Sequence, residues 1–248
     1  MSSDPQGVPK RSLRQNVLPA FTKLMHGSAP FITTFMLIHL TAPMLANLGG
    51  SSLASQTLLL GREYYQTDFG EKYLLLGPLA VHSLSGVAKR ILSPAKAPPR
   101  PWTSLLALTG YANMIIFLPI HFMTHRVLPM NPAPPIHALG PSELDFEFVK
   151  YGLAKWPWRS CILYGALVAG VVLHAVDGER LLFNTYFGET MGRFKMATRK
   201  RLLAIGFGLL AVPVLSGLFF MSKEPLLVFP STAERVQASF VQFPLFRV

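Results

Sequence analysis

Five apolar segments of about 20 residues dominate this sequence, and their length constrains the fold more than any other feature. They cover approximately residues 29–48, 73–92, 104–125, 161–183 and 202–222. A helix of about 20 apolar residues crosses the hydrocarbon core of a bilayer. Half of the 248 residues are hydrophobic and 14% are charged, against roughly 25% charged in soluble proteins. The sequence therefore predicts an all-α membrane protein, a transmembrane bundle of five helices.

An internal two-helix repeat is indicated inside this bundle. The first and third spans share Phe, Ile and His in register, in "FMLIHLTAPML" (35–45) and "FLPIHFMTHRVL" (117–128). The second and fourth share His-x-x-x-Gly followed by Arg, in "VHSLSGVAKRIL" (81–92) and "LHAVDGERLLF" (173–183). We expect a basic cytosolic tail (1–24), a transmembrane bundle (25–225) and an interfacial C-terminal tail (226–248). Within the bundle, the first repeat covers 25–92, the second repeat 104–183 and the added fifth span 202–222.

The distribution of charge predicts an orientation. Fourteen of the 23 Lys and Arg residues lie in the N-terminal tail and in the loops after the second and fourth spans, with four of the 12 acids. Because Lys and Arg remain on the side that needs no translocation, the N-terminus is expected in the cytosol, or in the matrix if the membrane is an inner one. The basic residues are spread over three loops without interleaved aromatics, so they indicate contacts with lipid head groups and not nucleic-acid binding.

Four histidines lie near or beyond the midpoints of the first four spans: His39, His82, His121 and His174. Residues four apart share one face of a helix. His82 therefore has Pro78 and Gly86 on its face, while His174 has Gly170 and Gly178. The missing side chains would leave a flat slot beside each imidazole. On the first and third spans an aromatic residue, Phe35 or Phe117, takes the corresponding place.

Consecutive spans run in opposite directions, which places the four histidines in two layers. His39 pairs with His121 in one layer, and His82 pairs with His174 in the other. Such pairs are what bis-histidine haem b requires, and two layers would hold one or two haems. Four basic residues near the span ends are placed to meet haem propionates: Lys89, Arg90, Arg126 and Arg180. The alternative is that each histidine bonds a neighbouring helix or lines a polar cavity, with no metal involved.

The remaining polar and aromatic residues predict little chemistry. His26, His125 and His137 lie at span ends or in a loop, where water reaches them. Gly27 and Gly110 are expected to permit close helix packing, and Trp156 and Trp158 to form an interfacial aromatic belt. A transporter is not expected, because Asp177, at an interface, is the one acidic candidate near a span. No nucleophile and base stand together, and Ser83 and Ser85 point away from His82, so an enzyme is not expected.

The phrases "IHLTAP", "IHFMTH", "HSLSGVAKR" and "HAVDGER" resemble the dihaem cytochrome b membrane anchor of succinate dehydrogenases and fumarate reductases, over roughly residues 20–225. Within that superfamily the chain is most similar to the fungal MCP family of mitochondrial outer-membrane adaptors. The anchor subunits present a Ser and Arg pair before the first span, where this chain has Ser28 and no arginine. The resemblance therefore favours the adaptor over quinone chemistry.

The MCP resemblance implies a partner and a docking motif. Members of that family recruit a bridge-type Vps-family lipid-transfer protein to an organelle contact through a short Pro-x-Pro segment facing the cytosol, and support mitochondrial lipid homeostasis. Here "PPRP" (98–101), with Pro99 and Pro101, lies on the predicted cytosolic side, and "NPAPP" (131–135) lies on the other. The resemblance thus implies an outer-membrane adaptor, with a b-type cytochrome anchor of the inner membrane as the alternative.

Overall fold

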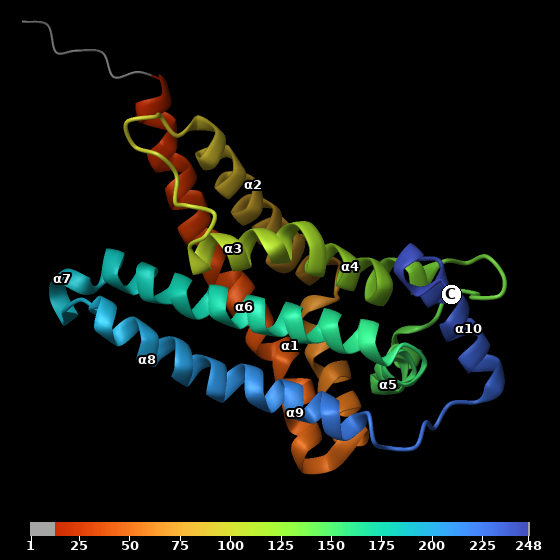
Figure 1. Ribbon diagram of the computed structural model, residues 1–248. Coiled ribbons are helices and arrows are strands. Elements are labelled where there is room, and N and C mark those ends of the chain that lie inside the picture. The colour runs from red at the N-terminus through yellow and green to blue at the C-terminus, as the bar shows by residue number, and fades with distance from the viewer. Residues whose placement is uncertain (1–12, 248) are drawn as a thin grey trace, which may run out of the picture.

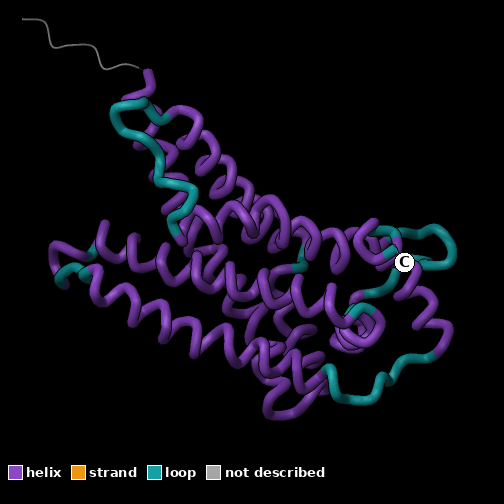
Figure 2. Tube along the Cα trace, in the orientation of Figure 1, coloured by secondary structure: helices purple, strands orange, loops and turns teal. Residues whose placement is uncertain are grey.

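The computed structural model describes residues 13–247, and the predicted tail residues 1–12 lie outside the described part. The described chain is helical without strands (Figures 1 and 2). The first helix begins at Leu13 and not near residue 29, so the second half of the predicted tail belongs to it. The main elements of the bundle, in chain order, are α1 (Leu13–Tyr65), η1 (Gly70–Leu76), α2 (Gly77–Leu92), α3 (Leu105–Ala112), α6 (Pro157–Tyr186), α8 (Met196–Gly206) and α9 (Val212–Met221).

Glycine divides α1 into two helices. Gly49 has non-helical angles, and Gly50 has φ +62°, in the left-handed region that favours glycine. The first part ends where the predicted span 29–48 ends. After the kink, the Glu224 carboxylate accepts from the backbone N–H of Ser51 at 3.0 Å, so it caps the helix that restarts there.

Proline sets the irregular turns of the other helices. Four wide π-turn segments occur: η1, η2 (Asn113–Phe117), η3 (Met123–Val127) and η6 (Phe207–Ala211). Each is followed, at the second position of the next element, by a proline: Pro78, Pro119, Pro129 or Pro213. Proline has no N–H and its ring crowds the preceding turn, which widens in response. The segments that follow η3 and η2, η4 (Leu128–Met130) and α4 (Leu118–Phe122), are therefore short.

The helices pack as a bundle in which α1 contacts α2 and α9, while α6 contacts α3 and α8. Helix α6 turns through α7 (Gly188–Met191) and returns along α8 and α9 (Figure 1). Close approach is possible because Gly217 has no side chain: a Cβ there would lie 1.9 Å from the Pro43 carbonyl oxygen. Where α1, α6 and the fifth span cross, the core is formed by Met36, Leu40, Val168, Val172, Ala211 and Val214.

Four stretches of described helix are long and apolar enough to cross a membrane: Val17–Tyr65, Leu105–Met130, Pro157–Tyr186 and Met196–Met221. Only 17–28% of the residues in their apolar windows is buried within the protein, so much apolar surface is left for contact with lipid. The all-α membrane fold is thereby confirmed. The predicted second span, 73–92, is helical in η1 and α2 but is too polar to join this group, so the count of five stays a prediction.

A cap covers the end of the bundle that lies away from the start of α1 (Figure 1). We define this cap as residues 129–156 and 225–247. It contains η5 (Pro141–Glu143), α5 (Phe146–Lys155), α10 (Pro230–Val241) and η7 (Pro244–Phe246). The predicted C-terminal tail is thus packed onto the loop and helix before α6 (Figure 1). Trp156 is part of this packing and only 5% exposed, unlike Trp158 at 81%, so Trp156 does not belong to an interfacial belt. The cap core comprises Ile136, Leu139, Leu144, Phe148, Tyr151, Trp156, Val236, Phe240 and Phe246.

Candidate functional site

The structure brings the four histidines together in two pairs. His39 of α1 lies beside His121 of α4, with ring centroids 6.0 Å apart and planes at 74°. His82 of α2 lies beside His174 of α6, with ring centroids 6.2 Å apart and planes at 82°. These are the two pairings expected from the alternating direction of the spans. His121 lies in α4, between the π segments η2 and η3.

Three of the four imidazoles have Nδ1 held by a neighbour. Nδ1 of His82 lies 3.1 Å from the Met25 carbonyl oxygen, and Nδ1 of His174 lies 3.0 Å from that of Leu106. A carbonyl oxygen only accepts, so the proton is on Nδ1 and Nε2 carries a free lone pair. His39 has its Nδ1 3.1 Å from the Tyr65 hydroxyl. His121 differs, because its buried Nδ1 has no partner among the described residues.

A bis-histidine haem would need two imidazoles from facing helices at about the same height, and each pair meets that condition. The second requirement is space for a macrocycle between the helices. The two pairs differ in this respect.

Beside the His82–His174 pair, two of the predicted glycine positions are open. A Cβ on Gly178 would meet nothing within 4 Å, and one on Gly86 would meet only Met25, at 3.9 Å. Gly170 is different, since a Cβ there would lie 2.7 Å from the Asn113 amide nitrogen. The expected slot at Gly170 is therefore filled by a side chain from the facing helix. The paired imidazoles and the two open glycines are the features of this layer that a haem would need.

The His39–His121 pair has two imidazoles side by side but no room for a macrocycle next to them. The cavity lined by His121 has a volume of about 10 Å³, which is room for about one water molecule. Phe35 stacks on His39 with centroids 5.3 Å apart. In this packing a macrocycle does not fit beside His121, so the residues of this layer do not fit the second haem.

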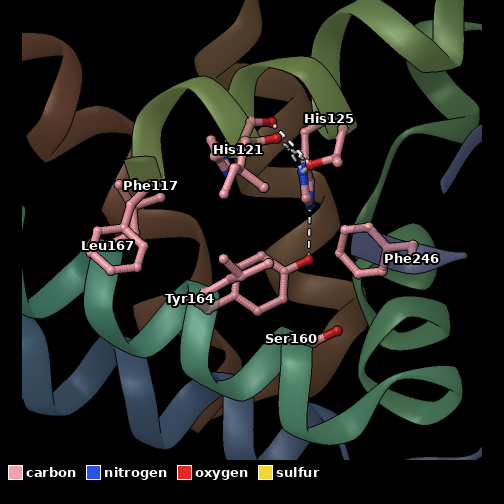
Figure 3. Close-up of a pocket in the computed structure, with 10 residues that line it drawn as sticks. Phe117, His121, His125, Ser160, Tyr164, Leu167 and Phe246 are labelled. Carbon is pink, nitrogen blue, oxygen red and sulfur yellow. Dashed lines mark hydrogen bonds between the residues drawn. The ribbon is translucent and has the colours of Figure 1, made fainter. Parts of the chain in front are cut away.

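His125 is hydrogen-bonded inside the bundle and does not lie at a water-accessible span end (Figure 3). The Tyr164 hydroxyl lies 2.8 Å from His125 Nε2, and the His121 carbonyl oxygen lies 3.2 Å from His125 Nδ1. The rings of His121 and His125 stack with centroids 4.5 Å apart. The sequence interpretation missed this because the cap, with Phe148 and Phe240, closes over the helix end. Tyr164 could have been found from its helical spacing with Val168 and Val172.

Comparison with known families identifies the second half of this bundle. Residues 116–221 match the transmembrane domain of MDM10-complementing protein 1. Over these residues the chain is similar to the MCP family. The matched region contains His121 and His174 and the fifth span, while His39 and His82 precede it. No curated protein and no solved structure matches the chain. The likeness to the succinate dehydrogenase anchor stays a prediction.

The MCP match indicates a mitochondrial membrane protein, and the family description names no catalytic activity. Its matched region includes Arg180, which we expected near a haem propionate. Arg180 is instead paired with Asp177 at 3.0 Å. Asp177 is 2% exposed and also binds Arg199 at 2.7 Å, so it is buried within the protein, and its position at the membrane interface stays a prediction. Two guanidinium groups make this burial possible, because a buried carboxylate requires charged partners.

The other expected contacts lie before the region that matches the MCP transmembrane domain. The Arg90 guanidinium stacks on Trp102 at 3.6 Å and donates to the Arg100 carbonyl oxygen at 2.8 Å. Arg90 is thereby engaged with the loop between α2 and α3. This loop carries "PPRP", in which Pro101 is exposed and Pro99 half-buried, and lies at the same end as the start of α1 (Figure 2).

Proposed function

We propose that the chain is a multi-pass adaptor of the mitochondrial outer membrane, with its N-terminus in the cytosol. It recruits a bridge-type Vps-family lipid-transfer protein at an organelle contact and supports mitochondrial lipid homeostasis. The observation that carries this proposal is the exposed "PPRP" segment beside a bundle that matches the MCP transmembrane domain. Lipid transfer by a bridge protein requires an anchored docking point on the acceptor membrane, and this segment supplies one.

The way the segment is held supports docking. Proline fixes φ near −65° and lowers the entropy lost on binding, which is why Pro-rich segments serve as ligands. Arg90 adds a second restraint through the Arg100 carbonyl and the Trp102 ring. The side chains of Arg100 and Pro101 stay exposed. A partner can therefore bind a preformed surface at the membrane face that carries the predicted positive charge.

The docking test uses full-length chain in detergent and a pull-down of the Vps-family lipid-transfer protein. The Pro99→Ala, Pro101→Ala variant is expected to lose capture. The matched control is Pro132→Ala, Pro134→Ala, which changes two exposed prolines at the opposite end of the bundle. Equal capture by both variants would refute docking at "PPRP". Protease digestion of intact mitochondria then tests the membrane, because an outer-membrane adaptor exposes its N-terminus and an inner-membrane protein protects it.

A second function, a b-type cytochrome, is favoured by one observation: the geometry of the His82–His174 pair. Haem iron supplies reversible one-electron transfer when bound. The role of His82 and His174 would be to present Nε2 on each side, with Met25 and Leu106 holding the rings. An adaptor could contain this site, so the two functions are compatible.

The haem test is an absorption spectrum of protein purified after haem-replete expression. A reducible low-spin band that is lost in His82→Ala and His174→Ala, and kept in the control His26→Ala, supports the site. His26 is a suitable control because its Nδ1 contacts Tyr186, outside both pairs. Colourless protein would exclude the cytochrome and leave the adaptor unaffected.

A further inference from the structure

A groove of about 810 Å³ opens on the cap, at the junction of α5 and α6 and along α10. Two cations without an acidic partner line this groove. Neither Lys155 nor Arg247 forms an ion pair among the described residues. The described lining residues include no carboxylate: Lys155, Trp156, Gln237, Val241 and Arg247.

The polar groups of the groove are either held in place by neighbours or keep a donor without an acceptor. Trp156 is 5% exposed, and its indole Nε1 has no hydrogen-bond partner in the described part of the chain. A buried donor without an acceptor is costly. The Gln237 Oε1 accepts from Tyr151 at 2.8 Å, so its amide nitrogen is left to donate. The Arg247 guanidinium is fixed by the carbonyl oxygens of Val241 and Gln242, at 3.1 and 3.0 Å.

The groove lies where lipid head groups lie. Lys155 and Trp156 directly precede Pro157, the first residue of the candidate span Pro157–Tyr186. On the first turns of that span, the side chain of Trp158 is 81% exposed and that of Ile162 is 63% exposed. An exposed tryptophan suits the membrane interface, and an exposed isoleucine suits the acyl chains. The start of a long helix also carries partial positive charge. Donors and positive charge therefore converge at one end of a lipid-facing helix.

We propose that this groove binds the phosphate of an anionic phospholipid from the leaflet beside the cap. Phosphate oxygens only accept, and the polar groups that line the groove are an ammonium, a guanidinium, an amide and an indole N–H, all of them donors. The acyl chains would run along the apolar face of α6. A zwitterionic head group brings its own cation, which Lys155 and Arg247 repel. This inference requires neither the adaptor role nor haem.

The test uses full-length chain in phosphatidylcholine nanodiscs, with phosphatidic acid added and retained lipid measured by native mass spectrometry. Removing both cations in Lys155→Gln, Arg247→Gln is expected to lower the affinity for phosphatidic acid about thirtyfold. Trp156→Phe keeps the ring, removes the donor and weakens binding severalfold. The control Lys223→Gln removes a charge outside the groove, after the fifth span, and is expected to bind like the wild type. An unchanged melting temperature of the double variant shows that its fold is intact.

Three results would overturn the proposal. Equal retention by the double variant and Lys223→Gln would show that the groove is not the site. Equal retention of phosphatidylcholine and phosphatidic acid would remove the requirement for negative charge. Displacement of phosphatidic acid by millimolar inorganic phosphate alone would identify a free anion, and not a lipid, as the ligand.

Discussion

The imidazole of His174 lies directly against Gly110: a Cβ at Gly110 would be 2.6 Å from the His174 Cε1 atom. Leu106, whose carbonyl oxygen binds His174 Nδ1, lies one turn earlier on the same helix. The ring is therefore held by a backbone acceptor and by the absence of a side chain. Met25 positions His82 in a related way, through its own carbonyl oxygen.

Gly110→Ala is expected to displace the His174 ring and to lower the free energy of unfolding by about 1–3 kcal/mol, as inserted methyl groups do in packed interiors. Any haem band would weaken with it. Thermal melting in detergent measures the first effect and absorption spectroscopy the second. Gly27→Ala is the matched control, since a Cβ there meets nothing within 4 Å. Equal melting temperatures for both variants would contradict the contact.

Asp177→Asn is expected to destabilise the protein by about 3 kcal/mol, because it leaves the buried guanidinium of Arg180 without its charged partner. It also releases Arg199 and so loosens α8 from α6. The apparent melting temperature measures the loss. Glu189→Gln is the control: Glu189 is 90% exposed and 3.9 Å from Arg193, so its removal costs close to nothing. A similar melting temperature for Asp177→Asn would disprove the role of the cluster.

Gly50→Ala is expected to destabilise the kink of α1 by about 2 kcal/mol or more. An L-residue at φ +62° is strained, and the new Cβ would lie 2.5 Å from the Glu224 Oε1 atom, which caps the restarted helix. Gly208→Ala, in a helix with nothing within 4 Å of the added Cβ, should be neutral or stabilising. Chemical denaturation in detergent compares the two. A Gly50→Ala protein as stable as Gly208→Ala would show that the kink tolerates a side chain.

Acidification is expected to loosen the cap through Glu143. The Gly140 N–H and then Arg235 hold the pKa of the Glu143 carboxyl below its ordinary 4.5, although burial opposes them. The ionised Glu143 carboxylate therefore stabilises the folded cap fully at pH values above its ordinary pKa. This stabilisation is lost as the pH falls through the lowered pKa of the folded state. Trp156 fluorescence from pH 7 to pH 3 reports the cap, because Trp156 packs on Phe240 and Phe246. Glu143→Gln should remove this part of the pH dependence, and identical titrations of both proteins would argue against it.

The sequence by itself determined the helical membrane fold and the pairing of histidines. Both follow from features that can be read along the chain. The length of the apolar segments predicts the spans, and the alternating direction of successive spans predicts which histidines lie at the same height in the membrane. The MCP resemblance was likewise available from short phrases around those histidines, and the family match over 116–221 confirms it.

Only the tertiary structure decided what surrounds each histidine. Asn113 fills the gap at Gly170, Phe35 and a cavity of about 10 Å³ leave no room beside the His39–His121 pair, and the cap buries His125. Asp177 could be buried because Arg199 reaches it from a helix 22 residues further along the chain. These outcomes depend on which side chains meet across helices, and helical spacing within one segment carries no information about the facing one.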